Sequence, residues 1–278
     1  MPTIQTQHAH APQTELYYET YGQGRPVVLI HGWPLSGRMW EGQIDALRHA
    51  GYQVVAYDRR GFGQSGKTAT GYTYDVFAAD LRDLLRALNL NDVTLVGFSM
   101  GGGEVSRYAG LYGTERLRSA MLVASVAPYL MKTADNPDGG PSEQDIEGMV
   151  QQVAQNRPQF LAGFTRKFLN WDQFGAQLGD EFLEFAASLY LQASPVATQE
   201  CVRAFSETDF RQDLASLTVP TLVVHGDQDQ IVPLEASGQR VAQYQPGAQL
   251  HVMKGAPHGL NATHNDEFNR ILLEFVAR

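Results

Sequence analysis

Residues 94–104, "TLVGFSMGGGE", decide the fold of this 278-residue chain. An apolar run typical of a buried strand leads into the pattern G-x-S-x-G at residues 97–101, and a helix is expected to begin near Gly101. A sharp strand-to-helix turn holds its serine in a strained backbone, and glycines flank it because side chains there would collide with neighbouring elements. The alternative is a Gly-rich turn with an incidental serine. The setting between strand and helix favours Ser99 as a nucleophile whose hydroxyl is lifted out of the sheet, over the N-terminus of a helix.

Short β-rich runs alternate with helix-period segments on both sides of this motif, which is the pattern of a parallel sheet covered by helices. Residues 15–21, "ELYYETY", alternate as a half-buried antiparallel edge strand would. Residues 75–88 carry apolar side chains at helical spacing. The other strand runs are almost continuously apolar, as in strands buried on both faces: "PVVLIH", "YQVVAY", "VTLVGF", "SAMLVAS", "PTLVVHG" and "AQLHVMK".

The pattern changes between residues 128 and 217, where strand runs disappear. Amphipathic stretches predict helices over 142–155, 158–170, 180–193 and 195–205, the last with Ser194 as N-cap ahead of a proline. A helical block inserted between two sheet strands indicates a lid over the carboxyl edge of the sheet. We therefore expect a core domain of residues 1–127 and 218–278 and a helical cap of residues 128–217.

The composition excludes several classes of protein. A net charge of -9 and a pI near 5.3 argue against a nucleic-acid or anionic-membrane surface, which needs a basic patch. The single cysteine, Cys201, permits neither an intramolecular disulfide nor a CxxC zinc site. No signal peptide or membrane-spanning run is recognisable, so we expect a cytoplasmic protein whose His8 and His10 lie in a solvated N-terminal tail.

A serine hydroxyl needs an oriented base, and in this type of fold the base is a histidine that follows the acid along the chain. His258, in "MKGAPHGLNATH", follows the last strand run and fits this order. The other histidines fit less well, because they lie in strand runs (His225, His251), in a helix (His49) or at the start of the final helix (His264).

The acid should come from residues 221–233, "TLVVHGDQDQIVP", where two aspartates compete. Asp227 follows a turn glycine and could cap loop amides. Asp229 lies further out, nearer the expected position of His258, and is favoured. Its role would be to orient the imidazole and to stabilise the imidazolium without taking the proton itself.

Acyl transfer also needs donors for the developing oxyanion. One should be the backbone N–H of Met100, the residue after the nucleophile. The second should come from "HGWP" at residues 31–34, and since Pro34 has no N–H, Trp33 is the candidate. Gly32 is then expected to be a glycine because the backbone packs closely against its neighbours there. His31 is expected to have a structural role, with its ring nitrogens hydrogen-bonded inside the protein. The neighbouring Arg59 and Arg60 are expected to form salt bridges to Asp58 or to nearby loops rather than to bind an anion.

These motifs carry a resemblance over nearly the whole chain. Together with residues 94–104, the stretches "VVLIHGWPLSGRMWE", "YDRRGFGQS", "GYTYDVFAADL", "HGDQDQIVP" and "GAPHGLNATH" resemble the cofactor-free (non-haem) haloperoxidases, arylesterases and perhydrolases of the α/β-hydrolase superfamily. The resemblance implies an α/β-hydrolase fold, with a mostly parallel eight-stranded sheet flanked by helices and a helical lid after the sixth strand. It places the triad on Ser99, Asp229 and His258, and the oxyanion donors on Trp33 and Met100.

The family implies ester hydrolysis through an acyl-enzyme. It also implies perhydrolysis, in which hydrogen peroxide captures the acyl group of an ester or carboxylic acid as a peracid. The peracid then oxidises halide away from the enzyme, so no haem, vanadium, other metal or cofactor is expected. Its members assemble as homo-oligomers, so a trimer or hexamer is expected as well.

The resemblance leaves the substrate pocket open. Phe160 and Phe164 of the lid are expected to line it with Trp33 and Met100, and Pro34 and Ile231 are further candidates. A residue before proline is restricted to extended backbone angles, so Pro34 fixes the direction of the Trp33 carbonyl. We hypothesise that this carbonyl accepts a hydrogen bond from the attacking peroxide and thereby favours perhydrolysis over hydrolysis.

Other readings of the same residues remain open. Amide or lactam hydrolysis on the same triad is the nearest alternative, and a ligand-binding receptor with little turnover is an alternative from a different class. Haloalkane dehalogenases and epoxide hydrolases are disfavoured because both use an aspartate nucleophile, whereas residue 99 is a serine.

Overall fold

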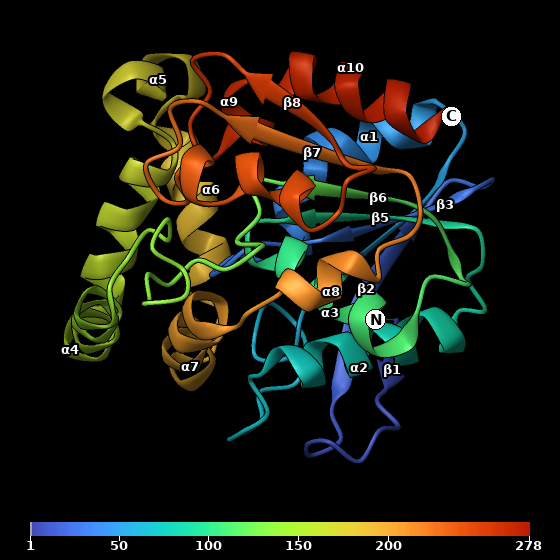
Figure 1. The fold of residues 1–278 in the computed structure, drawn as a ribbon, viewed down its shortest axis with the longest axis horizontal. Coiled ribbons are helices and arrows are strands. Elements are labelled where there is room, and N and C mark those ends of the chain that lie inside the picture. The colour runs from blue at the N-terminus through green and yellow to red at the C-terminus, as the bar shows by residue number, and fades with distance from the viewer. Residues whose placement is uncertain (1) are drawn as a thin grey trace.

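An eight-stranded sheet runs through the protein in the order β1-β2-β4-β3-β5-β6-β7-β8 (Figure 1). The computed structural model describes residues 2–278, and Met1, the first residue of the expected core domain, lies outside the described residues. The pairs β1–β2 and β2–β4 are antiparallel, and the remaining pairs are parallel. The mostly parallel eight-stranded sheet is therefore confirmed. Its strands are β1 (Thr3–Gln5), β2 (Glu15–Tyr21), β3 (Pro26–Ile30), β4 (Gln53–Tyr57), β5 (Val93–Phe98), β6 (Leu117–Val123), β7 (Thr221–Gly226) and β8 (Gln249–Met253).

The N-terminal segment is not the expected solvated tail. β1 pairs with β2, so β2 is bonded on both sides and is not an edge strand. His8 is buried, and its Nε2 lies 2.7 Å from Asp80 Oδ1. The backbone N–H groups of Gln7 and His8 both donate to Asp83 Oδ2. The prediction was wrong because these carboxylates lie on a helix far along the chain, whereas His10 is exposed as expected.

Helices cover both faces of the sheet. α1 (Glu41–His49) and α10 (Asn265–Val276) lie on one face, and α2 (Tyr74–Ala87) and α3 (Met100–Tyr112) lie on the other (Figure 1). Side chains alternate between the two faces along each strand, so neighbouring residues of β3 belong to separate apolar clusters. Burial on both faces explains the continuous apolar runs of β3, β4, β5, β6 and β7. The same expectation is wrong for β8, which lies at the edge of the sheet and is mostly exposed. Shorter elements complete the core: η1 (Gly37–Trp40), η2 (Leu234–Ala236), η3 (Gly238–Gln243) and α9 (Leu260–Thr263).

A helical insertion follows β6, as predicted. Its helices α4, α5 and α7 lie beyond the carboxyl ends of the parallel strands, at the left of Figure 1. The predicted helices over 142–155 and 158–170 form one element, α4, which is kinked at Asn156 (φ −152°, ψ 74°). Ser194 caps α7 as predicted, since its side chain accepts a hydrogen bond from the Ala197 N–H. The insertion contains α4 (Glu143–Phe168), α5 (Trp171–Leu178), α6 (Asp180–Tyr190), α7 (Pro195–Glu207) and α8 (Arg211–Ala215).

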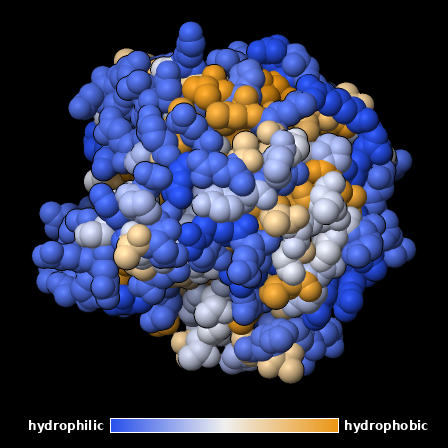
Figure 2. Space-filling view, viewed as in Figure 1, coloured by the Kyte–Doolittle hydropathy of each residue, from blue (hydrophilic) through white to orange (hydrophobic). Residues whose placement is uncertain are grey.

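Three expectations about the whole chain stay open. The exact domain boundaries, at residues 128 and 217, stay a prediction. Within residues 2–278, no helix has the length and apolar character needed to cross a membrane; the predicted cytoplasmic location stays a prediction. The face in Figure 2 is mostly hydrophilic with smaller hydrophobic patches. The expected trimer or hexamer also stays a prediction. At one edge of the sheet, β8 leaves Leu250 40% and Val252 37% exposed, and such an apolar edge could contact a second copy of the chain.

Candidate active site

Ser99 occupies the sharp turn between β5 and α3. Its backbone has φ 54° and ψ −116°, a region that residues other than glycine rarely adopt. A Cβ at Gly97 would lie 2.4 Å from the Gly101 carbonyl oxygen, and one at Gly101 would lie 2.5 Å from the Ile30 carbonyl oxygen. The chain can therefore make this turn only with glycine at both positions, which is the reason that the sequence pattern suggested.

A continuous chain of hydrogen bonds joins Ser99 to two loops at the carboxyl edge of the sheet. The Oγ of Ser99 lies 2.9 Å from Nε2 of His258, which follows β8. The Nδ1 of His258 lies 2.6 Å from Oδ2 of Asp229, which follows β7. With the proton on Nδ1 donated to the carboxylate, Nε2 is free to accept from the serine hydroxyl. The structure thus brings together the three residues that the sequence singled out.

The Asp229 carboxylate is buried and held on both oxygens. Its Oδ1 accepts backbone N–H groups from Ile231 at 2.9 Å and from Val232 at 2.8 Å. Burial alone would raise the pKa of Asp229, but the charge of His258 and the hydrogen bonds from His225 and His258 outweigh it and hold the pKa below its usual range. The carboxylate is therefore ionised and able to orient and stabilise an imidazolium.

Asp227, the competing aspartate, has a different partner. Its side chain is in an exposed position, and its Oδ1 accepts the backbone N–H of Gly255 at 2.7 Å. This is the loop-capping role that the sequence left open for it. Asp229, and not Asp227, is the carboxylate that reaches His258.

The His258 ring is packed between aromatic side chains. The centroids of the Phe98 and Phe168 rings lie 5.1 Å and 5.0 Å from the imidazole centroid. The histidine is only 1% exposed. Because water is largely excluded here, the carboxylate acts on the imidazole with little screening.

The loop after β3 is held rigidly against the site. His31 is fully buried, its Nε2 accepts the backbone N–H of Arg59 at 2.9 Å, and its Nδ1 lies 2.9 Å from the Gly32 carbonyl. Burial and the Arg59 charge hold the pKa of His31 well below its usual value. A Cβ on Gly32 would lie 2.7 Å from the Phe98 ring. Both structural expectations, a satisfied histidine and a glycine for close approach, are confirmed.

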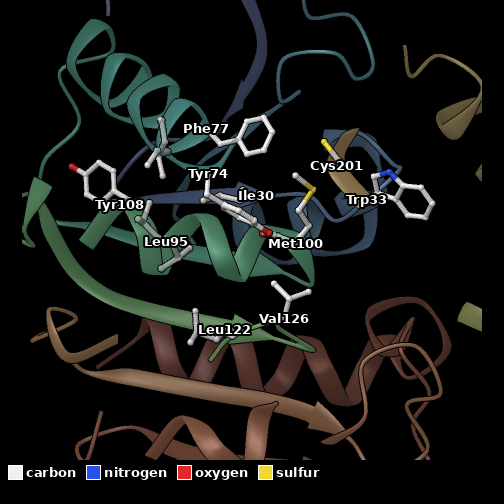
Figure 3. Packing of buried hydrophobic residues seen from close by; sticks show 14 of the residues in the cluster. Ile30, Trp33, Tyr74, Phe77, Leu95, Met100, Tyr108, Leu122, Val126 and Cys201 are labelled. Carbon is white, nitrogen blue, oxygen red and sulfur yellow. The ribbon is translucent and has the colours of Figure 1, made fainter. Parts of the chain in front are cut away.

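The two candidate oxyanion donors lie next to Ser99 along the chain or in space: Met100 follows it directly, and Trp33 follows Gly32, where a Cβ would lie 3.2 Å from the Ser99 Cβ. Within residues 2–278, the backbone N–H of neither Trp33 nor Met100 donates a hydrogen bond to another backbone group. Their positions are fixed from elsewhere: the indole Nε1 of Trp33 donates to the Thr198 carbonyl on α7 at 2.9 Å, and the Tyr74 hydroxyl donates to the Met100 carbonyl at 2.9 Å. Figure 3 shows Tyr74 directed towards Met100 within the buried cluster. Neither N–H group is therefore committed to a backbone partner in the described residues.

A cavity of about 920 Å³ opens onto Ser99 between the cap and the sheet. Phe160, Phe164 and Ile231, all expected pocket residues, line it. The Phe164 ring meets the Trp33 ring edge-on, with centroids 5.1 Å apart. Carboxamide side chains of α4, including Asn156 at its kink, also line the cavity: Gln152, Gln155, Asn156 and Gln159.

Two of the residues expected in this pocket lie elsewhere. Pro34 lines a separate cavity of about 470 Å³ on the other side of Trp33 and Phe164. Met100 is fully buried beneath the site and does not line either cavity. Met100 is the first residue of α3, and its side chain packs into the buried apolar cluster and not into the cavity (Figure 3).

The arginines after β4 pair with carboxylates other than the expected Asp58. Arg59 Nε lies 2.7 Å from Glu104 Oε2, and Arg60 Nε lies 2.6 Å from Asp80 Oδ2, with all four side chains buried. Asp58 instead accepts the backbone N–H groups of Gly37 and Gln64. Glu104 lies on α3, so its ion pair ties the helix that begins at Ser99 to the loop after β4. The sequence reasoning missed Glu104, which closes the "SMGGGE" motif.

The described residues offer no metal site. In residues 2–278, no group of three or more His, Cys, Asp or Glu side chains could hold a metal ion. Cys201 is fully buried on α7, and burial raises the pKa of its thiol. The expectation that the enzyme needs no cofactor stays a prediction.

The comparison with known families defines the class of protein first. Residues 25–264 match the family described as alpha/beta hydrolase fold. The match spans both parts of the core and the helical insertion between them. The chain therefore belongs to the α/β-hydrolase superfamily, as its fold and the sharp turn at Ser99 indicate.

Individual relatives narrow this class. A non-heme chloroperoxidase from Kitasatospora aureofaciens is 45% identical over 94% of this chain and 96% of the relative. A bifunctional esterase/perhydrolase from Acinetobacter calcoaceticus is 33% identical over 94% of this chain and 96% of the relative. The crystal structure of a bromoperoxidase from Bacillus anthracis superposes with a TM-score of 0.94 at 46% identity, covering all of both chains. The protein is an enzyme of this non-heme haloperoxidase and esterase/perhydrolase family.

Proposed function

We propose that the enzyme hydrolyses small or aryl carboxylic esters through an acyl-enzyme on Ser99, and that hydrogen peroxide can replace water as the acceptor of the acyl group. The observation that carries this proposal is the unbroken chain of hydrogen bonds from Asp229 through His258 to Ser99, placed at the wall of a mostly apolar cavity. A hydroxyl that can pass its proton to an oriented base is what acyl transfer requires.

In acylation, the Ser99 oxygen attacks the ester carbonyl while His258 Nε2 takes the hydroxyl proton. The ionised Asp229 stabilises the imidazolium that forms. The backbone N–H groups of Trp33 and Met100 donate to the oxyanion, each contributing on the order of 3 kcal/mol to transition-state stabilisation. When the tetrahedral intermediate collapses, the C–O bond to the alcohol breaks, and His258 returns the proton to the leaving alcohol.

In deacylation, His258 takes a proton from water or from hydrogen peroxide, and the resulting nucleophile attacks the acyl carbon. Water releases a carboxylic acid, and peroxide releases a peracid; in both cases His258 returns the proton to Ser99. The peracid then transfers an oxygen atom to a halide ion, which gives hypohalous acid after protonation and leaves the carboxylic acid. The halide chemistry therefore needs only the acyl-enzyme and peroxide.

The cavity favours an apolar acyl or aryl group beside the serine. The edge-on rings of Trp33, Phe160, Phe164 and Phe205 present an aromatic surface to the substrate. A flat or compact apolar group fits such a surface, whereas a charged group would lose its hydration there.

The expected homo-oligomer forms part of the proposal. An edge strand that exposes apolar side chains is a surface that invites a partner. Leu250 and Val252 of β8 form such an edge and support self-association.

Steady-state kinetics over 4-nitrophenyl esters of increasing acyl length, run with and without hydrogen peroxide, tests the proposal. We expect turnover to be highest with short or aryl acyl groups, and we expect peracid to accumulate only when peroxide is present. Absence of turnover with every ester would contradict the proposal and would favour amide or lactam substrates.

A further inference from the structure

His225 is a buried histidine beside the proposed catalytic acid that has no role in the steps above. It is the penultimate residue of β7 and is fully sealed from solvent. Its Nε2 lies 2.8 Å from the Val232 carbonyl oxygen and 3.2 Å from Asp229 Oδ2. A carbonyl and an ionised carboxylate can only accept hydrogen bonds, so Nε2 carries a proton. It donates this proton to the Val232 carbonyl, and the same N–H group lies against Asp229 Oδ2.

The other ring nitrogen has no comparable contact. Nδ1 of His225 is buried and has no hydrogen-bond partner within residues 2–278. Gly238 packs against it, and a Cβ at Gly238 would lie 2.6 Å from Nδ1. A buried polar atom without a partner costs on the order of 1–3 kcal/mol. The ring therefore makes its polar contacts only on the side that faces Asp229.

These contacts surround the carboxylate. The Val232 N–H donates to Asp229 Oδ1, and the Val232 carbonyl accepts from His225. Asp229 Oδ2 lies against both imidazoles, that of His225 and that of His258. Rotation of the carboxylate about its Cβ–Cγ bond would break bonds to His225, to Val232 and to His258 together.

We propose that His225 is a positioning residue that holds the Asp229 carboxylate in the orientation in which it meets His258. This inference rests on the proposed function, in which Asp229 and His258 serve Ser99. His225 does not line the cavity that opens onto Ser99, so it acts on catalysis through Asp229 and not on substrate binding.

Two variants of equal side-chain length separate positioning from packing. His225→Gln keeps an N–H donor near the position of Nε2, whereas His225→Met fills similar space without a donor. We expect His225→Met to lower kcat by about tenfold or more with little change in KM, because small displacements of a catalytic group are costly. His225→Gln should recover most of that loss. Rates are taken per active site, titrated with a fluorophosphonate, so that unfolded enzyme does not count.

A third variant keeps every polar group. Gly238→Ala crowds the His225 ring and should lower kcat in the same sense, with KM again little changed. If His225→Met does not fold, the kcat of Gly238→Ala tests the proposal in its place. Equal kcat in Gly238→Ala and in the unmodified enzyme would count against the proposal.

A double-mutant cycle with Asp229→Asn decides whether His225 acts through Asp229. We expect His225→Met to cause no further loss of kcat once Asp229→Asn is present. If the double variant loses the product of the two single losses in kcat, the two residues act independently. That result would overturn the positioning role of His225 without contradicting the proposed triad. An unchanged kcat in Asp229→Asn alone would overturn the proposed triad, and the role of His225 with it.

Discussion

Asp229 and His258 come from loops that follow different strands, yet their side chains meet at 2.6 Å between Oδ2 and Nδ1 while both are almost sealed from solvent. A charged hydrogen bond of this length, in a place where water cannot screen it, is strong. It fixes the imidazole so that Nε2 faces Ser99. The chemistry proposed for this enzyme depends on that pairing.

The first prediction compares the two neighbouring aspartates. Asp229→Asn should lower kcat for an aryl acetate by on the order of 10³–10⁴-fold, because an amide no longer stabilises the imidazolium or selects its tautomer. Asp227→Asn is the matched control and should change kcat only slightly, since Asp227 contacts a loop amide. Steady-state kinetics of both variants checks this, and the opposite ranking would contradict the assignment of the acid.

The second prediction concerns acid stability. The pKa of Asp229 lies below its usual value in the folded protein, against about 3.9 in the unfolded chain. Its contribution to stability is therefore fully present above the unfolded value and is lost as the pH falls towards the folded one. Urea unfolding between about pH 6 and pH 3 should show a steeper loss of unfolding free energy in the unmodified protein than in Asp229→Asn. Parallel curves would show that the carboxylate is not held in this way.

The third prediction concerns the nucleophile turn. Gly101→Ala places a methyl group 2.5 Å from the Ile30 carbonyl oxygen and should destabilise the protein by about 1–3 kcal/mol. Gly148→Ala is the control, because nothing lies within 4 Å of its Cβ position in α4. It should stabilise the protein by about 0.5–1 kcal/mol. Chemical unfolding measures both, and a neutral Gly101→Ala would mean that the turn is looser than described.

The fourth prediction concerns Pro34, which directly follows Trp33, the residue whose carbonyl is expected to accept a hydrogen bond from peroxide. Pro34→Leu frees the backbone of Trp33 and should lower the ratio of perhydrolysis to hydrolysis. Leu178→Met changes a residue of the same separate cavity that lies on α5 and not in the loop after β3, and it should leave the ratio unchanged. Peracid and acid formed from one ester are quantified side by side. If Pro34→Leu keeps the original ratio, Pro34 serves only to stiffen the loop.

The sequence predicted the sheet and the cap from the spacing of apolar residues. It predicted the residues that meet at Ser99 because each of them follows the end of a strand. Parallel strands bring their carboxyl ends to one edge, so positions after β5, β7 and β8 converge whatever the loops do. The nucleophile turn added a local pattern of glycines with a steric reason, which the structure bears out at Gly97 and Gly101.

Long-range partners were beyond the reach of the same reasoning. Arg59 pairs with Glu104, and His8 pairs with Asp80, across more than forty residues in each case, and no local pattern marks either pair. The sequence places His225 in a strand run, which disfavours a catalytic role, although it stands four residues before Asp229. That short spacing across a strand end was the one signal that could have revealed it.

The most direct test measures Ser99→Ala in two assays, hydrolysis of an aryl acetate and peroxide-dependent bromination in metal-free buffer with a carboxylic acid present. Both activities should disappear together, to below about 10⁻³ of the unmodified rate, while the thermal unfolding of the variant stays close to that of the unmodified protein. Bromination that survives the loss of hydrolysis would contradict the account, because the halide chemistry would then not depend on an acyl group carried by Ser99.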